Sequence, residues 1–179
     1  IDPGIKIDKD YFDYKEALEK DYFCKRADGP YMKGKVWPGE CNFPDYTNPV
    51  VREWWAGLFK ELISDIGVKG VWNDMNEPAV MEVPNKTFPM DVRHDYDGNP
   101  CSHRKAHNIY GTQMARATYH GVKRFAYPKR PFIITRSAYS GAQCYTSSWT
   151  GDNVASWEHL WIANIQMQRM SISGMGLTG

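Results

Sequence analysis

Two carboxylates stand beside tryptophan and amide side chains in a short stretch near the middle of the chain. This stretch is Trp72-Asn73-Asp74-Met75-Asn76-Glu77-Pro78, and it follows a short apolar run that begins at Gly70. A second stretch, Trp149-Thr150-Gly151-Asp152-Asn153, again places an acid between an aromatic side chain and an amide. Cleavage of a glycosidic bond requires two such acids, because one acts on the sugar carbon or on water while the other donates a proton. The two stretches therefore predict a sugar-cleaving carboxylate pair.

Asp74 and Asp152 are expected to act in opposite protonation states, at the separation of about 5–5.5 Å that cleavage with retention requires. An ionised Asp74 would attack the anomeric carbon and form a covalent glycosyl ester. Asn76, as a hydrogen-bond donor, and Arg136, as a neighbouring cation, would favour that charge. Asp152 would be protonated at rest, because the charge of Asp74 and the apolar ring of Trp149 favour the neutral acid. After giving up its proton, it would deprotonate the incoming water.

Strands and helices alternate along the chain, and this alternation predicts a parallel α/β fold. The expected strands cover residues 1–7, 68–72, 132–135 and 148–150, with a further strand beginning at 174. The expected helices cover residues 14–20, 49–66, 105–125 and 154–173, and long loops cover 81–104 and most of 11–46. Four tryptophans lie on helix faces and are expected to pack: Trp54, Trp55, Trp157 and Trp161.

Three polar residues follow successive expected strands, namely Asp74, Arg136 and Asp152. In a barrel of alternating strands and helices, catalytic groups lie at the carboxyl ends of the strands, where the following loops converge. Each residue alone is more simply a turn or helix cap. Because all three occupy equivalent positions, we expect them to face one pocket.

The bulk composition is that of one globular domain with a real core, with 179 residues of which 42% are hydrophobic. The 22 basic and 21 acidic residues give a net charge of +1, which provides no electrostatic basis for binding nucleic acid or an anionic membrane surface. No apolar run approaches the roughly 18 residues of a membrane span. We therefore expect a neutral partner, no nucleic acid and no membrane, and the oligomeric state stays open.

Metal and disulfide chemistry is not expected. The cysteines lack C-x-x-C spacing and are expected to be free thiols: Cys24, Cys41, Cys101 and Cys144. Four histidines lack metal-ligand spacing with nearby acids: His103, His107, His120 and His159. We expect neither a metal nor a cofactor. The compartment stays open, with the bacterial cytoplasm or periplasm as the working expectation.

The stretch from Trp72 to Pro78 resembles the nucleophile signature of family 31 glycoside hydrolases, the retaining α-glucosidases and their relatives. Further matches keep the order of that family: Val36-Trp37-Pro38-Gly39, Phe43-Pro44-Asp45, Trp54-Trp55, Thr135-Arg136-Ser137, Gly141 and the Trp149 stretch. The resemblance runs along essentially the whole chain. It implies an exo-acting α-glucosidase that hydrolyses terminal α-linked glucose from an oligosaccharide through a covalent intermediate.

The same resemblance implies roles for individual residues. Asp74 would be the nucleophile and Asp152 the general acid/base, with Asn76 and Glu77 in supporting positions. The sugar pocket would be lined by Trp37, Trp72, Met75, Arg136 and Trp149. On sequence alone Glu77 rivals Asp74 as the nucleophile. We prefer Asp74, because it lies nearer the expected strand end and matches the family position.

For the fold, the resemblance implies a partial (β/α)8 TIM barrel with roughly strands three to six and their helices. Residues 1–179 would be part of one catalytic barrel domain, truncated at both ends. The start at Ile1, without an initiator methionine or a signal-peptide pattern, is expected to be a cut. Because an open half barrel leaves its sheet edges unpaired, the isolated chain is expected to be unstable and inactive.

Several alternatives stay open. A related α-glycosidase, a transglycosylase or an α-glucan lyase of the same family would share the covalent intermediate. Within the family, the residues Met75 to Pro78 resemble the glucose-specific members rather than the xylosidases and sulfoquinovosidases. A non-catalytic carbohydrate-binding relative would be expected to lose one carboxylate, whereas both Asp74 and Asp152 are present.

Overall fold

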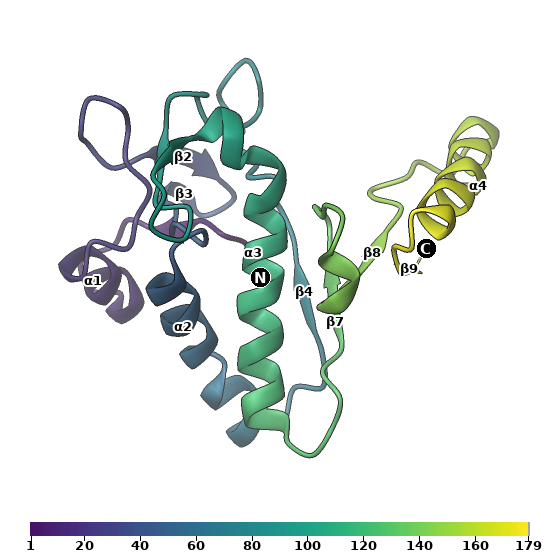
Figure 1. The fold of residues 1–179 in the computed structure, drawn as a ribbon, viewed down its shortest axis with the longest axis horizontal. Helices are drawn as coiled ribbons and strands as arrows, with labels where there is room; N and C mark the ends of the chain where they lie inside the picture. The colour runs from purple at the N-terminus through teal and green to yellow at the C-terminus, as the bar shows by residue number, and fades with distance from the viewer. Residues whose placement is uncertain (179) are drawn as a thin grey trace.

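A parallel sheet of four strands runs through the computed structural model, which describes residues 1–178 (Figure 1). Its strands follow one another in sequence order, as β4 (Val71–Asn73), β7 (Ile133–Thr135), β8 (Ser147–Trp149) and β9 (Leu177–Thr178). Helix α3 (His103–Ala126) connects β4 to β7, and α4 (Trp157–Ile172) connects β8 to β9. Parallel strands joined by helical crossovers confirm the predicted α/β alternation.

The strand register brings three polar or aromatic residues into one lateral row. Asn73 pairs with Thr135, and Thr135 pairs with Ser148. The next residue of each strand is therefore Asp74, Arg136 and Trp149, because neighbouring parallel strands keep their register. Asn73, Thr135 and Ser148 are buried, so the following residues of the row point to the opposite, more open face of the sheet.

The buried face of the sheet lies against α3, and α3 in turn packs on α2 (Pro49–Gly57). Helix α2 begins as predicted, since the side chain of Asn48 accepts a hydrogen bond from the Val50 amide and Pro49 occupies the first turn. A short π-helical turn, η1 (Glu61–Asp65), continues it. The two helices approach closely at Gly121, where a Cβ would lie 2.5 Å from the carbonyl oxygen of Ala56.

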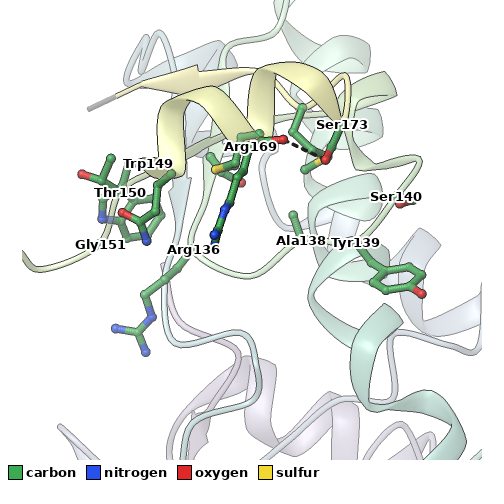
Figure 2. Close-up of a pocket in the computed structure, with 13 residues that line it drawn as sticks. Arg136, Ala138, Tyr139, Ser140, Trp149, Thr150, Gly151, Arg169 and Ser173 are labelled. Carbon is green, nitrogen blue, oxygen red and sulfur yellow. Dashed lines mark hydrogen bonds between the residues drawn. The ribbon is translucent and has the colours of Figure 1, made fainter. Parts of the chain in front are cut away.

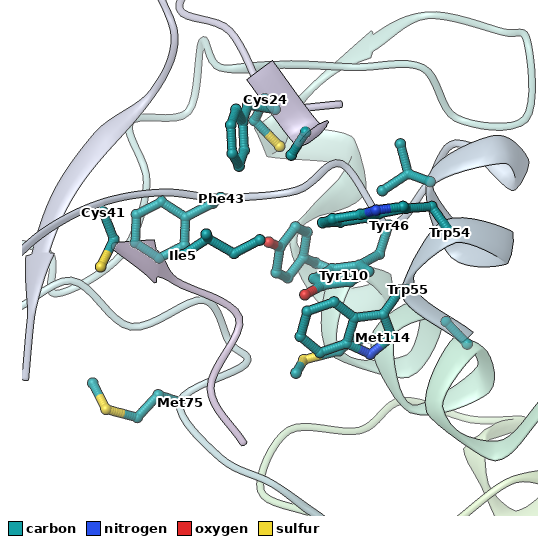
Figure 3. Packing of buried hydrophobic residues seen from close by; sticks show 14 of the residues in the cluster. Ile5, Cys24, Cys41, Phe43, Tyr46, Trp54, Trp55, Met75, Tyr110 and Met114 are labelled. Carbon is teal, nitrogen blue, oxygen red and sulfur yellow. The ribbon is translucent and has the colours of Figure 1, made fainter. Parts of the chain in front are cut away.

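Aromatic side chains fill the space between these helices and the N-terminal loops (Figure 3). Trp55 packs edge-on against Tyr46 and Phe59, and its indole N–H donates to the Thr118 hydroxyl. Trp54 and Trp55 are both buried. This confirms that these two tryptophans serve packing.

The N-terminal third contains more regular structure than the sequence predicted. A three-stranded antiparallel sheet is formed by β1 (Ile5–Lys6), β2 (Lys33–Val36) and β3 (Gly39–Asn42), with α1 (Phe12–Glu19) beside it. The prediction of a long loop was therefore wrong over residues 33–42. Trp37-Pro38 reads as a loop signal, but it forms the two-residue turn of a hairpin, which Gly39 closes at a φ of +104°.

Two smaller corrections concern short elements. The predicted loop over 81–104 contains a short hairpin of β5 (Arg93–His94) and β6 (Cys101–Ser102), and a 3-10 turn, η2 (Ala142–Cys144), precedes β8. The predicted strand over 1–7 is divided between two sheets. Ile5 and Lys6 pair with β3, whereas Ile1 hydrogen-bonds to β4.

Helix α4 contrasts with the other long helix, because none of its residues is buried. It lies apart from α2 and α3, at the yellow end of the chain (Figure 1). Trp157 and Trp161 are 87% and 65% exposed, so the prediction that they pack was wrong. The physical reason is that α4 packs chiefly against the short strand β9 among the elements described. Over residues 1–178, no helix combines the length and the hydropathy needed to cross a membrane.

Candidate active site

Arg136 lies at the centre of an acidic cluster at the carboxyl ends of β4 and β7. Its Nε and Nη2 atoms donate to the two carboxylate oxygens of Glu77 at 2.8 and 2.9 Å. Its Nη1 atom lies 3.1 Å from Oδ1 of Asp74 and 3.8 Å from Oδ2 of Asp152. The hydrogen bond that Arg136 donates to Glu77, together with the charges of Glu77, Asp74 and Asp152, raises the pKa of Arg136. One guanidinium thus brings together three acids from two stretches that are far apart in the sequence.

Asp74 is held through one of its two carboxylate oxygens. Oδ1 accepts a hydrogen bond from the Met75 amide at 2.8 Å and also faces Arg136. Met75 has a φ of +53°, a left-handed backbone conformation that is uncommon for residues other than glycine. Within the described chain no hydrogen bond or ion pair engages Oδ2 of Asp74. Asp74 therefore presents a positioned carboxylate with one oxygen available for chemistry.

Glu77 differs from Asp74 in this respect, because both of its oxygens are bound. The guanidinium of Arg136 engages them as a planar fork, the strongest arrangement of an arginine–carboxylate pair. An oxygen bound in this way is a poor nucleophile unless the fork opens. Glu77 is therefore suited to orient Arg136, and the geometry favours Asp74 over its rival for the attack.

Asn76 does not donate to Asp74, so that expectation was wrong. Its amide nitrogen donates to the Thr135 hydroxyl at 2.8 Å, and its oxygen accepts from the Ser137 amide at 3.0 Å. The side chain is fully buried and ties the loop after β4 to the loop after β7. Helix α3 approaches this junction at Gly111, where a Cβ would lie 2.6 Å from the Asn76 carbonyl oxygen. The donor that Asp74 uses instead is the neighbouring backbone amide of Met75.

The residues predicted to line the sugar pocket are brought together only in part. Trp72 and Trp149 pack edge to face, with ring centroids 5.0 Å apart, and Trp72 is half-exposed beside the cluster. Trp37 lies at the β2–β3 turn with 79% of its surface exposed. Met75 is buried in the hydrophobic core, so its backbone rather than its side chain meets Asp74. Roles in sugar binding for these four residues remain predictions.

Asp152 lies in a more open environment than the sequence suggested. It follows Gly151, which has a φ of +95°, and 82% of its side chain is exposed. Among residues 1–178, the apolar surroundings expected from Trp149 do not cover this carboxylate. The loop turns the side chain toward solvent, where Arg136 is its ionic neighbour.

A pocket of about 540 Å³ borders the cluster on the side of β8 and α4 (Figure 2). Arg136, Trp149, Thr150 and Gly151 contribute to its lining, and Arg169 reaches into it from α4. Asp74, Glu77 and Asp152 lie outside this lining. The pocket therefore touches only one edge of the acidic cluster, and the open face of the sheet carries the rest.

A chain of hydrogen-bonded histidines that the sequence analysis missed lies in the core. His94 contacts Asp45 at 3.0 Å through Nδ1 and His103 at 2.9 Å through Nε2, and His103 contacts His107 at 3.0 Å. Burial, and then the neighbouring histidines, lower the pKa of His103 to about 3. The one available signal was the four-residue spacing of His103 and His107, which places both on one helix face. We call this set the histidine chain.

His94 of the histidine chain, together with Cys24 and Asp45, forms a cluster whose spacing could hold a metal ion. All three are buried, and their donor atoms lie within 4.8 Å of one another. Asp45 is already engaged, because the Thr47 hydroxyl and the Asp95 amide donate to its two oxygens. Burial raises the pKa of the Cys24 thiol well above its usual value, which disfavours the thiolate that binds metals.

Taken together, the fold and the cluster define a parallel α/β domain with carboxylates and an arginine at the carboxyl ends of adjacent strands, the position of active sites in TIM barrels. The family described as "Glycosyl hydrolases family 31 TIM-barrel domain" matches residues 1–179. The chain therefore belongs to glycosyl hydrolase family 31.

Named relatives in that family are α-glucosidases. The chain is 46% identical to "Alpha-glucosidase 2" of Bacillus thermoamyloliquefaciens over 181 residues, which cover 100% of this chain and 22% of the relative. It is 41% identical to "Neutral alpha-glucosidase C" of Homo sapiens, with coverage of 99% and 20%. The chain thus spans about a fifth of the length of these proteins.

Solved structures of related enzymes have the same fold. A crystal structure of the glucosidase II alpha subunit, bound to alpha3-Glc2, superposes with a TM-score of 0.88 at 36% identity and covers 99% of this chain and 20% of that one. The Family 31 alpha-glucosidase from Bacteroides thetaiotaomicron gives a TM-score of 0.81 at 42% identity, with coverage of 98% and 27%.

Proposed function

We propose that this chain forms part of the catalytic barrel of a retaining, exo-acting α-glucosidase that removes terminal α-linked glucose from oligosaccharides. The observation that carries the proposal is the shared guanidinium of Arg136, which contacts Asp74 and Asp152 from one atom. The names of the relatives support the α-glucoside specificity. Glucose recognition would be completed by parts of the enzyme beyond this fifth of its length.

Within the barrel, residues 1–179 contribute strands three to six of one catalytic domain. Ile1 supplies the end of strand three, since it hydrogen-bonds to both sides of Asn73. Strands β4, β7 and β8 then follow as strands four, five and six, in the order of the parallel sheet, and the short strand β9 beside β8 lies at the start of a seventh. An incomplete barrel has unpaired edges, so the 179-residue chain by itself is inactive in this proposal.

In the first half of the reaction, Oδ2 of Asp74 attacks the anomeric carbon and forms a covalent ester. The bond from that carbon to the leaving oxygen breaks, and Asp152 transfers its proton to this oxygen. The arrangement supports these roles because Oδ1 of Asp74 is fixed by Met75 and Arg136. Attack by a carboxylate that is already positioned requires little reorganisation.

In the second half, Asp152 takes a proton from water, and the resulting hydroxide displaces the Asp74 carboxylate. Within the described residues Asp152 is open to solvent, so water can reach its carboxylate for this step. Glu77 orients Arg136, and Asn76 joins the loops that carry Asp74 and Arg136. Trp72 and Trp149 offer apolar faces for the pyranose ring, with Trp37 and Met75 completing the sugar pocket.

The proposal is tested by proton NMR of p-nitrophenyl α-D-glucoside hydrolysis by the complete protein. We expect α-glucose to appear before mutarotation, and we expect Asp74→Ala to abolish it. Asp65→Ala is the matched control, because Asp65 is an exposed acid outside the cluster. Initial β-glucose would contradict the retaining mechanism, and the absence of cleavage would favour a carbohydrate-binding protein.

A further inference from the structure

We propose that Asp2 is a fourth carboxylate of the active site, a positioning residue that acts on the reaction through Asp74 and Arg136. This inference rests on the proposed glucosidase function. Its basis is the juxtaposition of Asp2 with Asp74 on neighbouring strands, and the fixed path of the residues that carry Asp2.

The backbone places Asp2 in register with Asp74. The amino nitrogen of Ile1 donates to the Trp72 carbonyl oxygen at 2.7 Å, and the Asp74 amide donates to the Ile1 carbonyl oxygen at 3.1 Å. These two bonds flank Asn73, as they do where one parallel strand is added beside another. Ile1 is thus opposite Asn73, and Asp2 is opposite Asp74.

This register also fixes the face on which Asp2 lies. Asn73 is buried against α3, where its amide nitrogen donates to the Thr118 hydroxyl at 3.2 Å. Alternate residues of a strand point to opposite faces, so Asp74 faces the open side, and Asp2 shares that side. Asp2 therefore extends the lateral row of Asp74, Arg136 and Trp149 by one strand.

The residues after Asp2 hold it in place from the other side. Pro3 is buried, and Gly4 is packed so closely that a Cβ there would lie 3.1 Å from Val36 and 3.2 Å from Cys41. The segment is therefore clamped between β4 and the antiparallel β2–β3 hairpin. A side chain on such a segment has few alternative positions.

The charges near Asp2 couple it electrostatically to the acidic cluster. Burial raises the pKa of Asp2, and the charge of Asp74 adds to this, while the guanidinium of Arg136 opposes it. On β3, the pKa of the Cys41 thiol is raised by burial and then by the charge of Asp2. No hydrogen bond to the Asp2 carboxylate occurs within residues 1–178. The Asp2 carboxylate therefore acts electrostatically on Asp74 and Arg136, and no hydrogen-bonded partner among the described residues offsets its charge.

This charge has two consequences for the reaction. A carboxylate beside Asp74 offsets part of the positive charge of Arg136 and thereby makes Oδ2 of Asp74 a stronger nucleophile. It also adds negative potential on the face where positive charge develops on the sugar carbon in the transition state. Neither effect requires Asp2 to touch the substrate.

The test compares Asp2→Asn, Asp2→Glu and the unchanged complete protein in the pH dependence of kcat and KM for p-nitrophenyl α-D-glucoside. For Asp2→Asn we expect the acid limb of kcat/KM to move to lower pH by about one unit, because Asp74 loses a like-charged neighbour. We expect kcat to fall about tenfold with little change in KM. Asp2→Glu should restore the limb, and Asp28→Asn, at an exposed acid, is the matched control.

The other kinetic outcomes contradict the inference in distinct ways. An unmoved acid limb with lower kcat would assign Asp2 a purely structural role, and a raised KM with an unmoved limb would make it a substrate contact. If Asp2→Asn does not fold, Asp2→Ser provides the same neutral comparison. Lack of turnover by the unchanged protein would overturn the glucosidase function itself, whereas turnover with no effect of Asp2→Asn would overturn this inference alone.

Discussion

The two carboxylates proposed as catalytic lie in regions of the sheet that are packed to different degrees. Asp74 is 28% exposed, and the strand before it is covered by α3, whose inner face is fully buried. Asp152 is 82% exposed, and the helix that follows it, α4, contains no buried residue. We call these the nucleophile region, residues 71–126, and the acid/base region, residues 147–172.

Within the described residues, the difference agrees with the tasks proposed for the two groups. A nucleophile must meet the sugar carbon at a fixed distance and angle, so a rigid support is an advantage. A general acid/base must exchange protons with a leaving group and then with water, so access to solvent is an advantage. The comparison also indicates that Arg136, which contacts both carboxylates, is the main link between the regions.

The largest effect is expected from breaking that link. In the complete protein, Arg136→Lys should lower kcat/KM about 100-fold to 1000-fold, because an ammonium cannot bind Glu77 as a fork and reach Asp74 at the same time. Arg130→Lys, at an exposed arginine, is the control and should leave the kinetics unchanged. A loss of less than threefold would mean that the two regions do not depend on the guanidinium.

The packing of the nucleophile region can be tested by a single methyl group. Gly121→Ala should lower the free energy of unfolding by about 1–3 kcal/mol, because the added Cβ would lie 2.5 Å from the Ala56 carbonyl oxygen. Gly57→Ala has no atom within 4 Å of the added Cβ and should not destabilise the protein. Urea unfolding of both variants checks this, and equal stabilities would show that the α2–α3 contact adapts freely.

A pH dependence is expected from the histidine chain in the core. The folded state lowers the pKa of His103 from 6.5 to about 3, and therefore favours its neutral form. This contribution to stability is present above pH 6.5, declines as the pH falls, and is lost at about pH 3. The free energy of unfolding should thus fall more steeply between pH 7 and pH 4 in the unchanged protein than in His103→Gln. An equal pH dependence of the free energy of unfolding in both proteins would contradict the lowered pKa of His103.

The smallest effect on stability is expected in the acid/base region. Trp161 is 65% exposed on α4 beside Leu160 and Met167, so Trp161→Glu should change the free energy of unfolding by less than about 0.5 kcal/mol. Trp55→Glu, in the core, should lower the free energy of unfolding far more. Urea unfolding of both variants of the complete protein checks this, and equal effects of the two changes would contradict the difference in packing.

Much of the fold could be predicted because local signals and packing agree. Asn48 and Pro49 mark the start of α2 correctly, and the apolar run before Asp74 correctly indicates a strand. The proximity of Asp74, Arg136 and Asp152 followed from one rule, that parallel strands end at the same edge of the sheet.

The remainder depended on contacts that no local pattern encodes. The partners of Asn76 are Thr135 and Ser137, about sixty positions away, so only the folded chain reveals that it joins two loops. The histidine chain likewise draws His94 and Asp45 from separate hairpins and loops. For α4, the apolar stripe indicated a buried face, whereas burial depends on which elements are present to cover it.

The central claim is that Asp74, and not Glu77, forms the covalent bond to glucose. The direct test is to treat the complete protein with a fluorinated glucosyl fluoride that forms the ester but hydrolyses slowly, and to digest it with trypsin. Both acids lie in the peptide from Gly70 to Lys86, so fragmentation by tandem mass spectrometry must locate the sugar. We predict the added mass on Asp74; a sugar attached to Glu77 would contradict the account.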